Sequence, residues 1–316
     1  MPSTSSGPRI KCISRSFSAH PILRRELLDL FPNAILNDQG LNYEGAALVE
    51  YLKNCDGAIV SLEPVDDALL AQLPELRIIS KYGVGIDNLD TDAMKRRNVA
   101  LGWTGGLNKR GVAEMTLGFM LGLCRNLFFA HRDLRERNDW TKRGGVQLTG
   151  RTIGIIGVGH VGKDLIELLR PFNCRILVND VIDQSDYYDA NGLIEASKDR
   201  IYAEADIVTV HTPLDGETRG MINLDVFRKM RRTAYLINAA RGPIVVQSDL
   251  KRALTEGLIA GAAIDVFEIE PCDDPKFMAL PNLYCTPHTG GSADESILAM
   301  GRSAIAHLAD FFKDRN

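Results

Sequence analysis

A glycine-rich turn in the middle of the chain has the residue types and spacing that bind a dinucleotide. Residues 157–162 read Gly-Val-Gly-His-Val-Gly, which fits the pattern G-x-G-x-x-G. Gly157 permits a tight turn, Gly159 lets the backbone approach a pyrophosphate, and Gly162 lets a helix pack closely on the preceding strand. The first turn of that helix would offer unpaired N–H groups and a partial positive charge to the phosphates.

The sequence around the turn supplies the other parts of this motif. The apolar run 152–156 predicts a strand before the turn, and apolar residues at helical spacing follow it. About eighteen residues after Gly162, a second apolar run ends in Asp180, which can bond the ribose hydroxyls. Since G-x-G-x-x-G alone also occurs in ordinary βα turns, the prediction rests on strand, helix and acid together. The Asp180 charge would repel a 2′-phosphate, so NAD rather than NADP is expected.

Three further segments place polar residues directly after predicted strands. They are Asn-Ala-Ala-Arg-Gly at 238–242, Asp-Val-Phe-Glu-Ile-Glu-Pro at 265–271, and Thr-Pro-His-Thr-Gly-Gly at 286–291. Ligands of an open parallel sheet bind beyond the carboxyl ends of its strands. Taken singly, the arginine would be read as a surface ion-pair residue, the Glu-Pro as a loop and the histidine as part of a turn. Their common position favours one shared site.

These segments resemble, in order and spacing, the family of D-isomer-specific 2-hydroxyacid dehydrogenases. The similarity extends over nearly the whole chain and includes residues 81–88, 112–114 and 211–214. Within the family, the likeness is greatest to 3-phosphoglycerate dehydrogenases and their short relatives. The resemblance implies hydride transfer between a nicotinamide and C2 of a small anionic D-2-hydroxy or 2-oxo acid. A phosphoglycerate-like or hydroxypyruvate-like substrate is expected.

The resemblance assigns catalytic roles to Arg241, Glu270 and His288. The guanidinium of Arg241 would hold the carboxylate and the carbonyl oxygen of the substrate, which its fork of donors suits. His288 would supply or remove the proton near neutral pH. Glu270 would bond the other ring nitrogen, fix the tautomer and raise the pKa of His288.

The same resemblance places further residues at the substrate and the cofactor. The backbone N–H groups of Gly83, Val84 and Gly85 would cradle the substrate carboxylate as a small anion nest. Lys81 would face a substrate phosphate or second acid group, or it is a solvated loop lysine. Val84 stands where some relatives carry a threonine that touches the cofactor, so that bond is expected to be missing. Besides Arg241 and His288, the expected cofactor contacts are Gly157, Gly159, His160, Val161, Gly162, Asp180, Thr212, Ala239, Ala240, Asp265 and Gly291.

Alternating apolar runs and helical patterns predict an α/β protein with two doubly wound parallel sheets. We expect a flavodoxin-like substrate domain (1–107 and 292–316), a Rossmann NAD-binding domain (108–291) and a cleft between them. A long helix from Gly111 to about Arg137 should bridge the two. Strands are predicted at 10–13, 34–36, 58–60, 77–79, 153–156, 176–178, 207–210, 235–237, 262–264 and 283–285, and a last helix at 293–312.

The composition argues against several other classes of protein. The net charge of −4 gives no reason to expect nucleic acid or an anionic membrane as a partner. No apolar run reaches the ~18 residues typical of a membrane span. Residues 1–8 are polar and lack the apolar core of a secretory signal, so a floppy tail and a cytoplasmic location are expected. The six cysteines form no C-x-x-C pair, so no metal site or disulfide framework is indicated.

Two other functions and two further expectations complete this interpretation. An NAD(H)-sensing, corepressor-like scaffold would keep the same catalytic residues and is the alternative function. A formate-type dehydrogenase is disfavoured, because relatives with that chemistry carry glutamine where Glu270 stands. The apolar surface of the long helix from Gly111 predicts a homodimer. Only a short segment follows His288, so serine feedback through a C-terminal regulatory domain is not expected.

Overall fold

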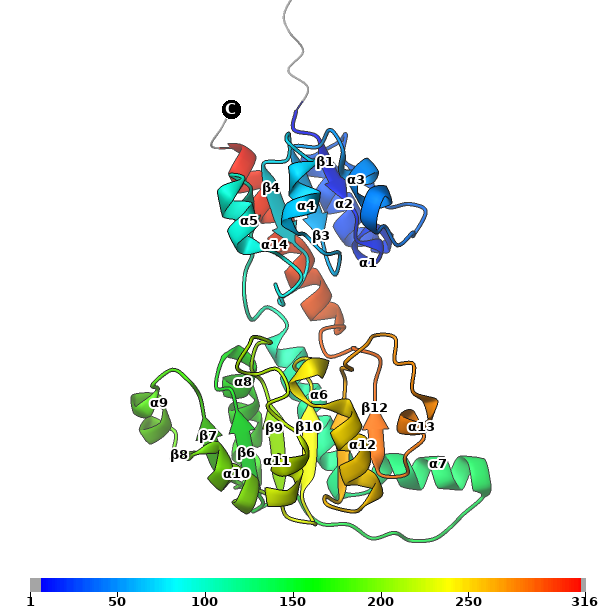
Figure 1. Ribbon diagram of the computed structural model, residues 1–316, viewed down its shortest axis with the longest axis vertical. Coiled ribbons are helices and arrows are strands. Elements are labelled where there is room, and N and C mark those ends of the chain that lie inside the picture. The colour runs from blue at the N-terminus through cyan, green and yellow to red at the C-terminus, as the bar shows by residue number, and fades with distance from the viewer. Residues whose placement is uncertain (1–6, 314–316) are drawn as a thin grey trace, which may run out of the picture. The chain divides into compact units, whose positions relative to one another are not determined.

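The protein divides into two compact α/β units, each built on its own parallel sheet (Figure 1). The computed structural model describes residues 7–313. Unit 1 consists of Met1–Asn108 and Asp294–Asn316, and unit 2 of Lys109–Ala293. Most of the tail expected at 1–8 lies outside the described residues. The α/β class with two doubly wound sheets is confirmed.

The sheet of unit 1 has five strands in the order β2-β1-β3-β4-β5, and every pair is parallel. This is the flavodoxin-like order, and the direction of winding reverses between β1 and β3. The strands are β1 (Ile10–Cys12), β2 (Ile35–Leu36), β3 (Gly57–Val60), β4 (Ile78–Lys81) and β5 (Ala100–Gly102).

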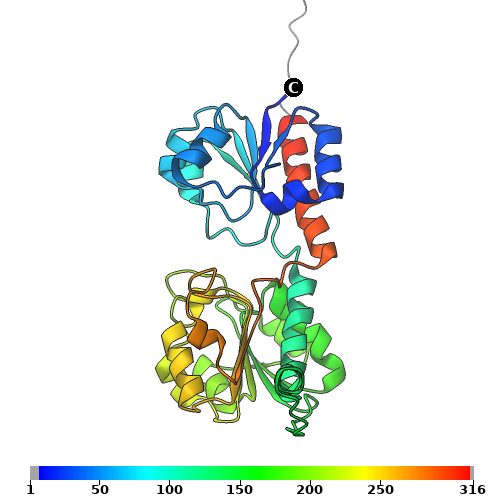
Figure 2. The ribbon, with the colours of Figure 1, turned by 90° about the vertical axis from the view of Figure 1, so that its right-hand side faces the viewer.

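Helices cover both faces of this sheet because successive side chains of each strand point to opposite sides. On β3, Ala58 and Val60 belong to one apolar cluster and Ile59 to the other. Figure 2 shows the two layers of helices on either side of the strands. One cluster is completed by α3 (Gly45–Leu52), α4 (Asp67–Ala71) and α5 (Thr91–Arg96), the other by α1 (Arg15–Ala19), α2 (Pro21–Leu30) and α14 (Asp294–Lys313).

The sheet of unit 2 has seven parallel strands in the order β12-β11-β10-β9-β6-β7-β8. Winding starts at the central β6 and reverses between β6 and β9, as in dinucleotide-binding folds. The strands are β6 (Thr152–Ile156), β7 (Arg175–Asn179), β8 (Ile194–Glu195), β9 (Ile207–Val210), β10 (Tyr235–Asn238), β11 (Gly261–Ile264) and β12 (Leu283–Cys285).

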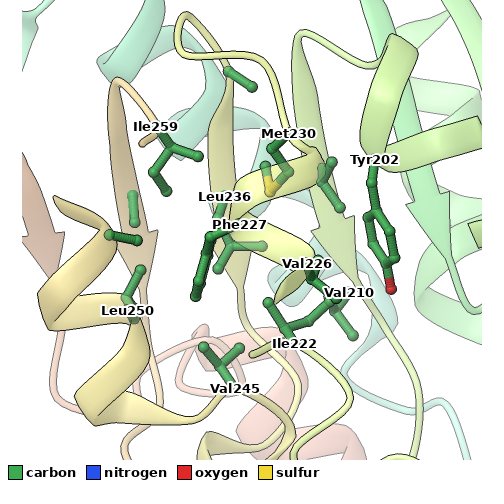
Figure 3. Close-up of a cluster of buried hydrophobic side chains, with 14 of the residues drawn as sticks. Tyr202, Val210, Ile222, Val226, Phe227, Met230, Leu236, Val245, Leu250 and Ile259 are labelled. Carbon is green, nitrogen blue, oxygen red and sulfur yellow. The ribbon is translucent and has the colours of Figure 1, made fainter. Parts of the chain in front are cut away.

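Apolar clusters on both faces of this sheet hold the unit together. In one of them Phe227 and Leu236 are completely buried, and Figure 3 shows how helix and strand side chains interlock there. Full burial of one such side chain stabilises the fold by about 1.5–3 kcal/mol. The helices are α6 (Lys109–Cys124), α7 (Leu127–Arg137), α8 (His160–Leu169), α9 (Ser185–Ala190), α10 (Lys198–Glu204), α11 (Leu224–Lys229), α12 (Gln247–Thr255) and α13 (Pro275–Met278), with short 3-10 turns at Arg170–Phe172 and Gly242–Ile244.

The prediction of one long helix from Gly111 to about Arg137 is wrong. Two helices, α6 and α7, meet there at an angle of 64°. Asn126 between them has a φ of +54°, a left-handed conformation that asparagine tolerates and that ends α6. Beyond the break, Phe128 stacks on Tyr284 of β12 with ring centroids 3.5 Å apart. Moreover, α6 begins at the first residue of unit 2, so it does not extend into unit 1.

No single helix within residues 7–313 is long and apolar enough to cross a membrane. The bent pair formed by α6 and α7 reaches that length and composition only when the two are taken together. Eight residues of α6 are buried in the core of unit 2, including Phe119, Met120 and Leu123. The apolar character of α6 is therefore explained by packing inside the unit.

Candidate active site

The glycine turn connects β6 to α8 in the conformation that its sequence predicts. Gly157 has a φ of +95°, and a Cβ there would lie 2.6 Å from the carbonyl oxygen of His211. A Cβ on Gly162 would lie 2.3 Å from the carbonyl oxygen of Gly157, so α8 packs closely on the turn. A Cβ on Gly159, by contrast, would meet no heavy atom within 4 Å. The space beside Gly159 is where a ligand can approach the backbone.

The surroundings of the turn fit the phosphates and ribose of a dinucleotide. Helix α8 starts at His160, and its N-cap Gly159 provides no side-chain acceptor for the first N–H groups. The Asp180 carboxylate follows β7 and accepts hydrogen bonds from Val158 N at 2.6 Å and Ile182 N at 3.0 Å. The acid therefore lies against the turn, as the motif requires.

Thr212 gives an independent sign of a ligand near this turn. Its Oγ1 is buried and has no hydrogen-bond partner anywhere in the described part of the chain. A buried hydroxyl without a partner is costly, by about 1–3 kcal/mol, unless a ligand or water satisfies it. Thr212 was predicted to contact the cofactor, and an unsatisfied hydroxyl at this position fits a dinucleotide.

The predicted catalytic residues follow three neighbouring strands. Arg241 comes after β10, Glu270 lies in the loop after β11, and His288 follows β12. Because these strands are adjacent and parallel, their carboxyl ends share one edge of the sheet. His288 Nδ1 lies 2.7 Å from Glu270 Oε2, and the other carboxylate oxygen of Glu270 accepts a bond from Phe267 N at 3.0 Å. The pairing of histidine and glutamate inferred from the resemblance is therefore present.

The charges of the three residues act on one another. The hydrogen bond to Glu270 raises the pKa of His288 above its ordinary value, against the opposing effects of burial and of the Arg241 charge. Burial alone would raise the pKa of Glu270, but the bonds from His288 and from Phe267 N together lower it. The pair therefore favours a charged imidazolium beside a carboxylate near neutral pH.

A second histidine at this edge of the sheet does not compete for the proton. His211 follows β9, and burial lowers its pKa to about 4. Its Nε2 lies 3.0 Å from the Thr209 hydroxyl. His211 is therefore uncharged near neutral pH, and His288 is the histidine suited to proton exchange.

Asp265 holds the loop that carries His288. Its buried carboxylate accepts bonds from Thr286 Oγ1 at 2.6 Å, Thr289 N at 2.7 Å and Gly290 N at 2.8 Å. Its carbonyl oxygen also accepts the N–H of His288 at 2.8 Å. The family resemblance had indicated only a contact between Asp265 and the cofactor. The positioning of the loop could not be foreseen, although the threonines and glycine around His288 supply its donors.

Asn238 is a second positioning residue that sequence reasoning missed. It is the last residue of β10 and is buried. Its side chain donates to the carbonyl oxygen of Arg241 at 2.9 Å and accepts the N–H of Ala240 at 3.1 Å. These bonds fix the turn through Ala239 and Ala240, which were predicted to contact the cofactor, and they orient Arg241.

Unit 1 contains the predicted substrate-binding residues. Lys81 is the last residue of β4 and is only 4% exposed. Its Nζ donates to Ser61 O and, at 2.7 Å, to Asn88 Oδ1. The reading of Lys81 as a solvated loop lysine is therefore wrong. The side chain instead runs beneath the next loop, since its Cε lies 3.2 Å from where a Cβ on Gly83 would stand.

The loop after β4 has the form of an anion nest. Gly83 has a φ of +148°, and Trp103 Nε1 donates to Val84 O at 2.9 Å, which fixes the loop. The N–H groups of Gly83, Val84 and Gly85 donate no hydrogen bond within residues 7–313. Backbone donors of this kind are suited to a carboxylate.

The remaining predicted residues lie next to the glycine turn and next to the loop that carries His288. His160 and Val161 open α8 directly after the glycine turn, and Gly291 follows the loop that Asp265 holds. Lys81 and residues 83–85 belong to unit 1, whereas all other predicted site residues belong to unit 2.

Known proteins share this arrangement of sequence and fold. Residues 117–290 match the family described as D-isomer specific 2-hydroxyacid dehydrogenase, NAD binding domain. A glyoxylate reductase from Korarchaeum cryptofilum is 34% identical over 274 residues, covering 84% of this chain and 82% of that protein. D-3-phosphoglycerate dehydrogenase from Rattus norvegicus is 31% identical, covering 93% of this chain but 57% of its own length. The solved structure of a glyoxylate reductase from Paecilomyes thermophila shares the fold, with a TM-score of 0.86, 22% identity and coverage of 100% and 97%. The chain therefore belongs to the D-isomer-specific 2-hydroxyacid dehydrogenase family and is an NAD-dependent oxidoreductase.

Proposed function

We propose that this enzyme interconverts a small anionic 2-oxo acid and its D-2-hydroxy acid, with a phosphoglycerate-like or hydroxypyruvate-like substrate. The observation that carries the proposal is the His288–Glu270 pair, at 2.7 Å, beside Arg241 on one sheet edge. NAD supplies the hydride acceptor and, when reduced, the hydride donor. The chain's own residues supply charge, proton and orientation.

His288 is the proton carrier in this scheme. Its Nδ1 faces Glu270, so Nε2 is the ring nitrogen that exchanges a proton with the substrate oxygen. In the reducing direction, the imidazolium gives its proton to the oxygen on C2 as negative charge develops there. In the oxidising direction, the neutral ring takes the proton back. Glu270 stabilises the imidazolium and keeps the ring oriented.

Two sets of donors bind the substrate in this proposal. The Arg241 guanidinium holds the carboxylate and polarises the oxygen on C2, because its planar fork matches both acceptors. The backbone N–H groups of Gly83, Val84 and Gly85 receive the carboxylate as a nest. Lys81 adds positive charge below that nest while it remains bonded to Ser61 O and Asn88 Oδ1.

A substrate panel tests the proposal. The purified protein is mixed with NADH and, in turn, glyoxylate, hydroxypyruvate, phosphohydroxypyruvate, pyruvate and 2-oxoglutarate, and loss of nicotinamide absorbance is followed. We expect turnover with hydroxypyruvate or phosphohydroxypyruvate. Tight NADH binding without turnover on any of the five would contradict the proposal and favour the NAD(H)-sensing scaffold. The relatives described above are named as reductases and dehydrogenases, which supports catalysis.

We also propose that the enzyme is a homodimer that uses α7 and the segment after it. This part of unit 2 exposes large apolar side chains, including Leu127, Leu134 and Trp140, the last at 76%. Exposed apolar residues gathered on one segment are typical of a protein interface. Light scattering at micromolar concentration should give twice the mass of one chain. A monomeric mass would contradict the proposal.

A further inference from the structure

Unit 1 contains a cavity at the edge of its sheet where ligands of such folds bind. The cavity measures about 790 Å³ and is lined by residues that follow β1, β2 and β3. These include Ser14–Ser16, Asn37, Asp38 and Ser61–Glu63. The winding of the sheet reverses between β1 and β3, and ligands of open α/β sheets bind outside the carboxyl ends at such a switch point. The position alone therefore marks this cavity as a candidate binding site.

The charged side chains that line the cavity differ in whether they are already bonded to other residues of the protein. Arg24 pairs with Asp38, and Glu63 Oε2 accepts the N–H of Ser61 at 2.6 Å. Arg15, by contrast, is exposed and forms no hydrogen bond or ion pair with any described residue. Among the lining residues, it is the one cation left without a partner in the described chain. A guanidinium so placed is suited to a carboxylate or phosphate, which it can bind through two parallel bonds.

Contacts within unit 1 join the residues after Arg15 to the loop that is proposed to hold the substrate carboxylate. The next residue, Ser16, has its hydroxyl against the Tyr82 phenol. Phe17 packs edge-on against the ring of Tyr82, with centroids 5.3 Å apart. Tyr82 directly precedes Gly83, the first residue of the nest. The start of α1 and the nest are therefore neighbours, although β3 lies between β1 and β4 in the sheet.

A second link runs along the other side of the cavity. Ser61 lines the cavity, and its carbonyl oxygen accepts the Lys81 ammonium. The side chain of Lys81 in turn passes beneath Gly83. Since neighbouring strands lie ~4.8 Å apart, the ends of β1 and β4 are separated by roughly 10 Å. A substrate of three to five carbons held at the nest, together with the long side chain of Arg15, can span a separation of this size.

We propose that Arg15 binds a second anionic group at the end of the substrate remote from the 2-oxo acid. This inference rests on the proposed function and names the substrate class as dianionic 2-oxo acids, in which the second group is a carboxylate or a phosphate. Lys81 is already engaged by acceptors of the protein, whereas Arg15 is oriented by no ion pair of its own. Arg15 is accordingly a specificity-determining residue and takes no part in proton transfer.

The test compares two classes of substrate in the Arg15→Ala variant. Glyoxylate and hydroxypyruvate carry one negative group, whereas phosphohydroxypyruvate and 2-oxoglutarate carry a second one, a phosphate and a carboxylate respectively. We expect kcat/KM for at least one dianionic substrate to fall by tenfold or more relative to the fall for glyoxylate, mainly through KM. A bond between charged groups is worth about 1.5–3 kcal/mol, which corresponds to roughly tenfold to a hundredfold. The dianion that is affected identifies the group.

Arg25→Ala is the matched control, because Arg25 is also an exposed arginine of unit 1 but does not line the cavity. It should leave the ratio between dianionic and monoanionic substrates unchanged, and Arg15→Lys should restore part of the lost discrimination. Equal losses on both classes in Arg15→Ala, or no loss on either dianion, would overturn the inference. Those results leave turnover by the unmodified enzyme intact, whereas failure of the proposed function abolishes turnover of every substrate in the unmodified enzyme.

Discussion

The carboxyl edges of the two sheets differ in how firmly their functional groups are held. In unit 2, His288 is bonded to Glu270, its loop is bonded to Asp265, and the turn before Arg241 is bonded to Asn238. In unit 1, the N–H groups of the nest and the Arg15 guanidinium have no acceptor within the described residues. The contrast indicates that the two units have different roles. In the proposed reaction, unit 2 fixes the geometry that hydride and proton transfer need, while unit 1 offers groups that different substrates can use.

The largest effect is expected from removing the proton carrier. His288→Ala should lower kcat by at least about a hundredfold in both directions, because a positioned acid or base contributes 10²–10⁴-fold. NADH affinity, measured by nicotinamide fluorescence, should remain nearly unchanged. A variant that retains more than a tenth of the turnover would show that His288 is not the proton carrier.

Removing the carboxylate of Asp265 should loosen the His288 loop at the carboxyl edge of the unit 2 sheet without removing a residue of proton transfer. Asp265→Ala removes the acceptor of the Thr286 and Thr289 hydroxyls and of the N–H groups of Thr289 and Gly290, so the free energy of unfolding should fall by about 3 kcal/mol. A displaced loop should lower kcat by roughly tenfold to a hundredfold. Denaturant unfolding and steady-state kinetics measure the two effects. Asp265→Asn, which keeps one acceptor oxygen, is the control and should lie between. Unaltered kcat in both variants would argue against a positioning role.

A matching change in unit 1 should act on substrate binding instead. Gly83 has a φ of +148°, which L-residues rarely adopt, so Gly83→Ala should displace the nest. We expect KM to rise by about tenfold for every 2-oxo acid, as a charged hydrogen bond is lost, with little change in kcat. If kcat fell as far as KM rose, the division between the two edges would not hold.

The choice of cofactor tests a third fixed contact. Asp180 lies against the glycine turn, and its charge opposes a 2′-phosphate. Asp180→Ala should raise the ratio of NADPH to NADH activity by about tenfold, the lower range for an interaction between charged groups. Initial rates with each cofactor give this ratio. A preference for NADPH in the unmodified enzyme would refute the assignment of Asp180.

The smallest expected effect is a displacement of the pH profile. Reduction needs the imidazolium, so its rate should fall as pH rises through the pKa of His288, while oxidation gains. Glu270 raises that pKa, and Glu270→Gln should therefore move the midpoint of the reductive profile to lower pH. Profiles of kcat/KM in both directions measure the change. Identical midpoints in variant and parent would mean that Glu270 does not set the charge of His288.

Local sequence patterns predicted the parts of the molecule whose conformation is set by residues close together in the chain. The glycine turn of residues 157–162 and the helix at 293–312 appear as expected, the latter as α14 (Asp294–Lys313). Short strands escaped detection, since β5 and β8 have three and two residues and no clear period. The break at Asn126 was missed because Leu127 and Phe128 continue the apolar pattern past it.

Contacts between distant segments account for what the sequence did not reveal at the site. Asp265 and Asn238 gain their positioning roles only when strand ends meet at the sheet edge, which no local pattern records. Lys81 was open to interpretation as a loop residue, but it is the last residue of β4 and is buried. Its ammonium donates to acceptors from two other segments. Nothing in the local sequence distinguishes Arg15 from other surface arginines, and only the folded structure places it at the cavity.

The bonds that Asp265 makes bear on how such an enzyme can diversify. The Asp265 carboxylate accepts three of the bonds that hold the loop, and the donors of these bonds lie within the five residues 286–290. The segment 265–290 thus contains the proposed acid–base pair, Glu270 and His288, together with the carboxylate that holds the His288 loop. Substitutions in unit 1 can therefore change which substrate binds without removing the residues of proton transfer. Substrate specificity can then evolve while the type of reaction stays the same.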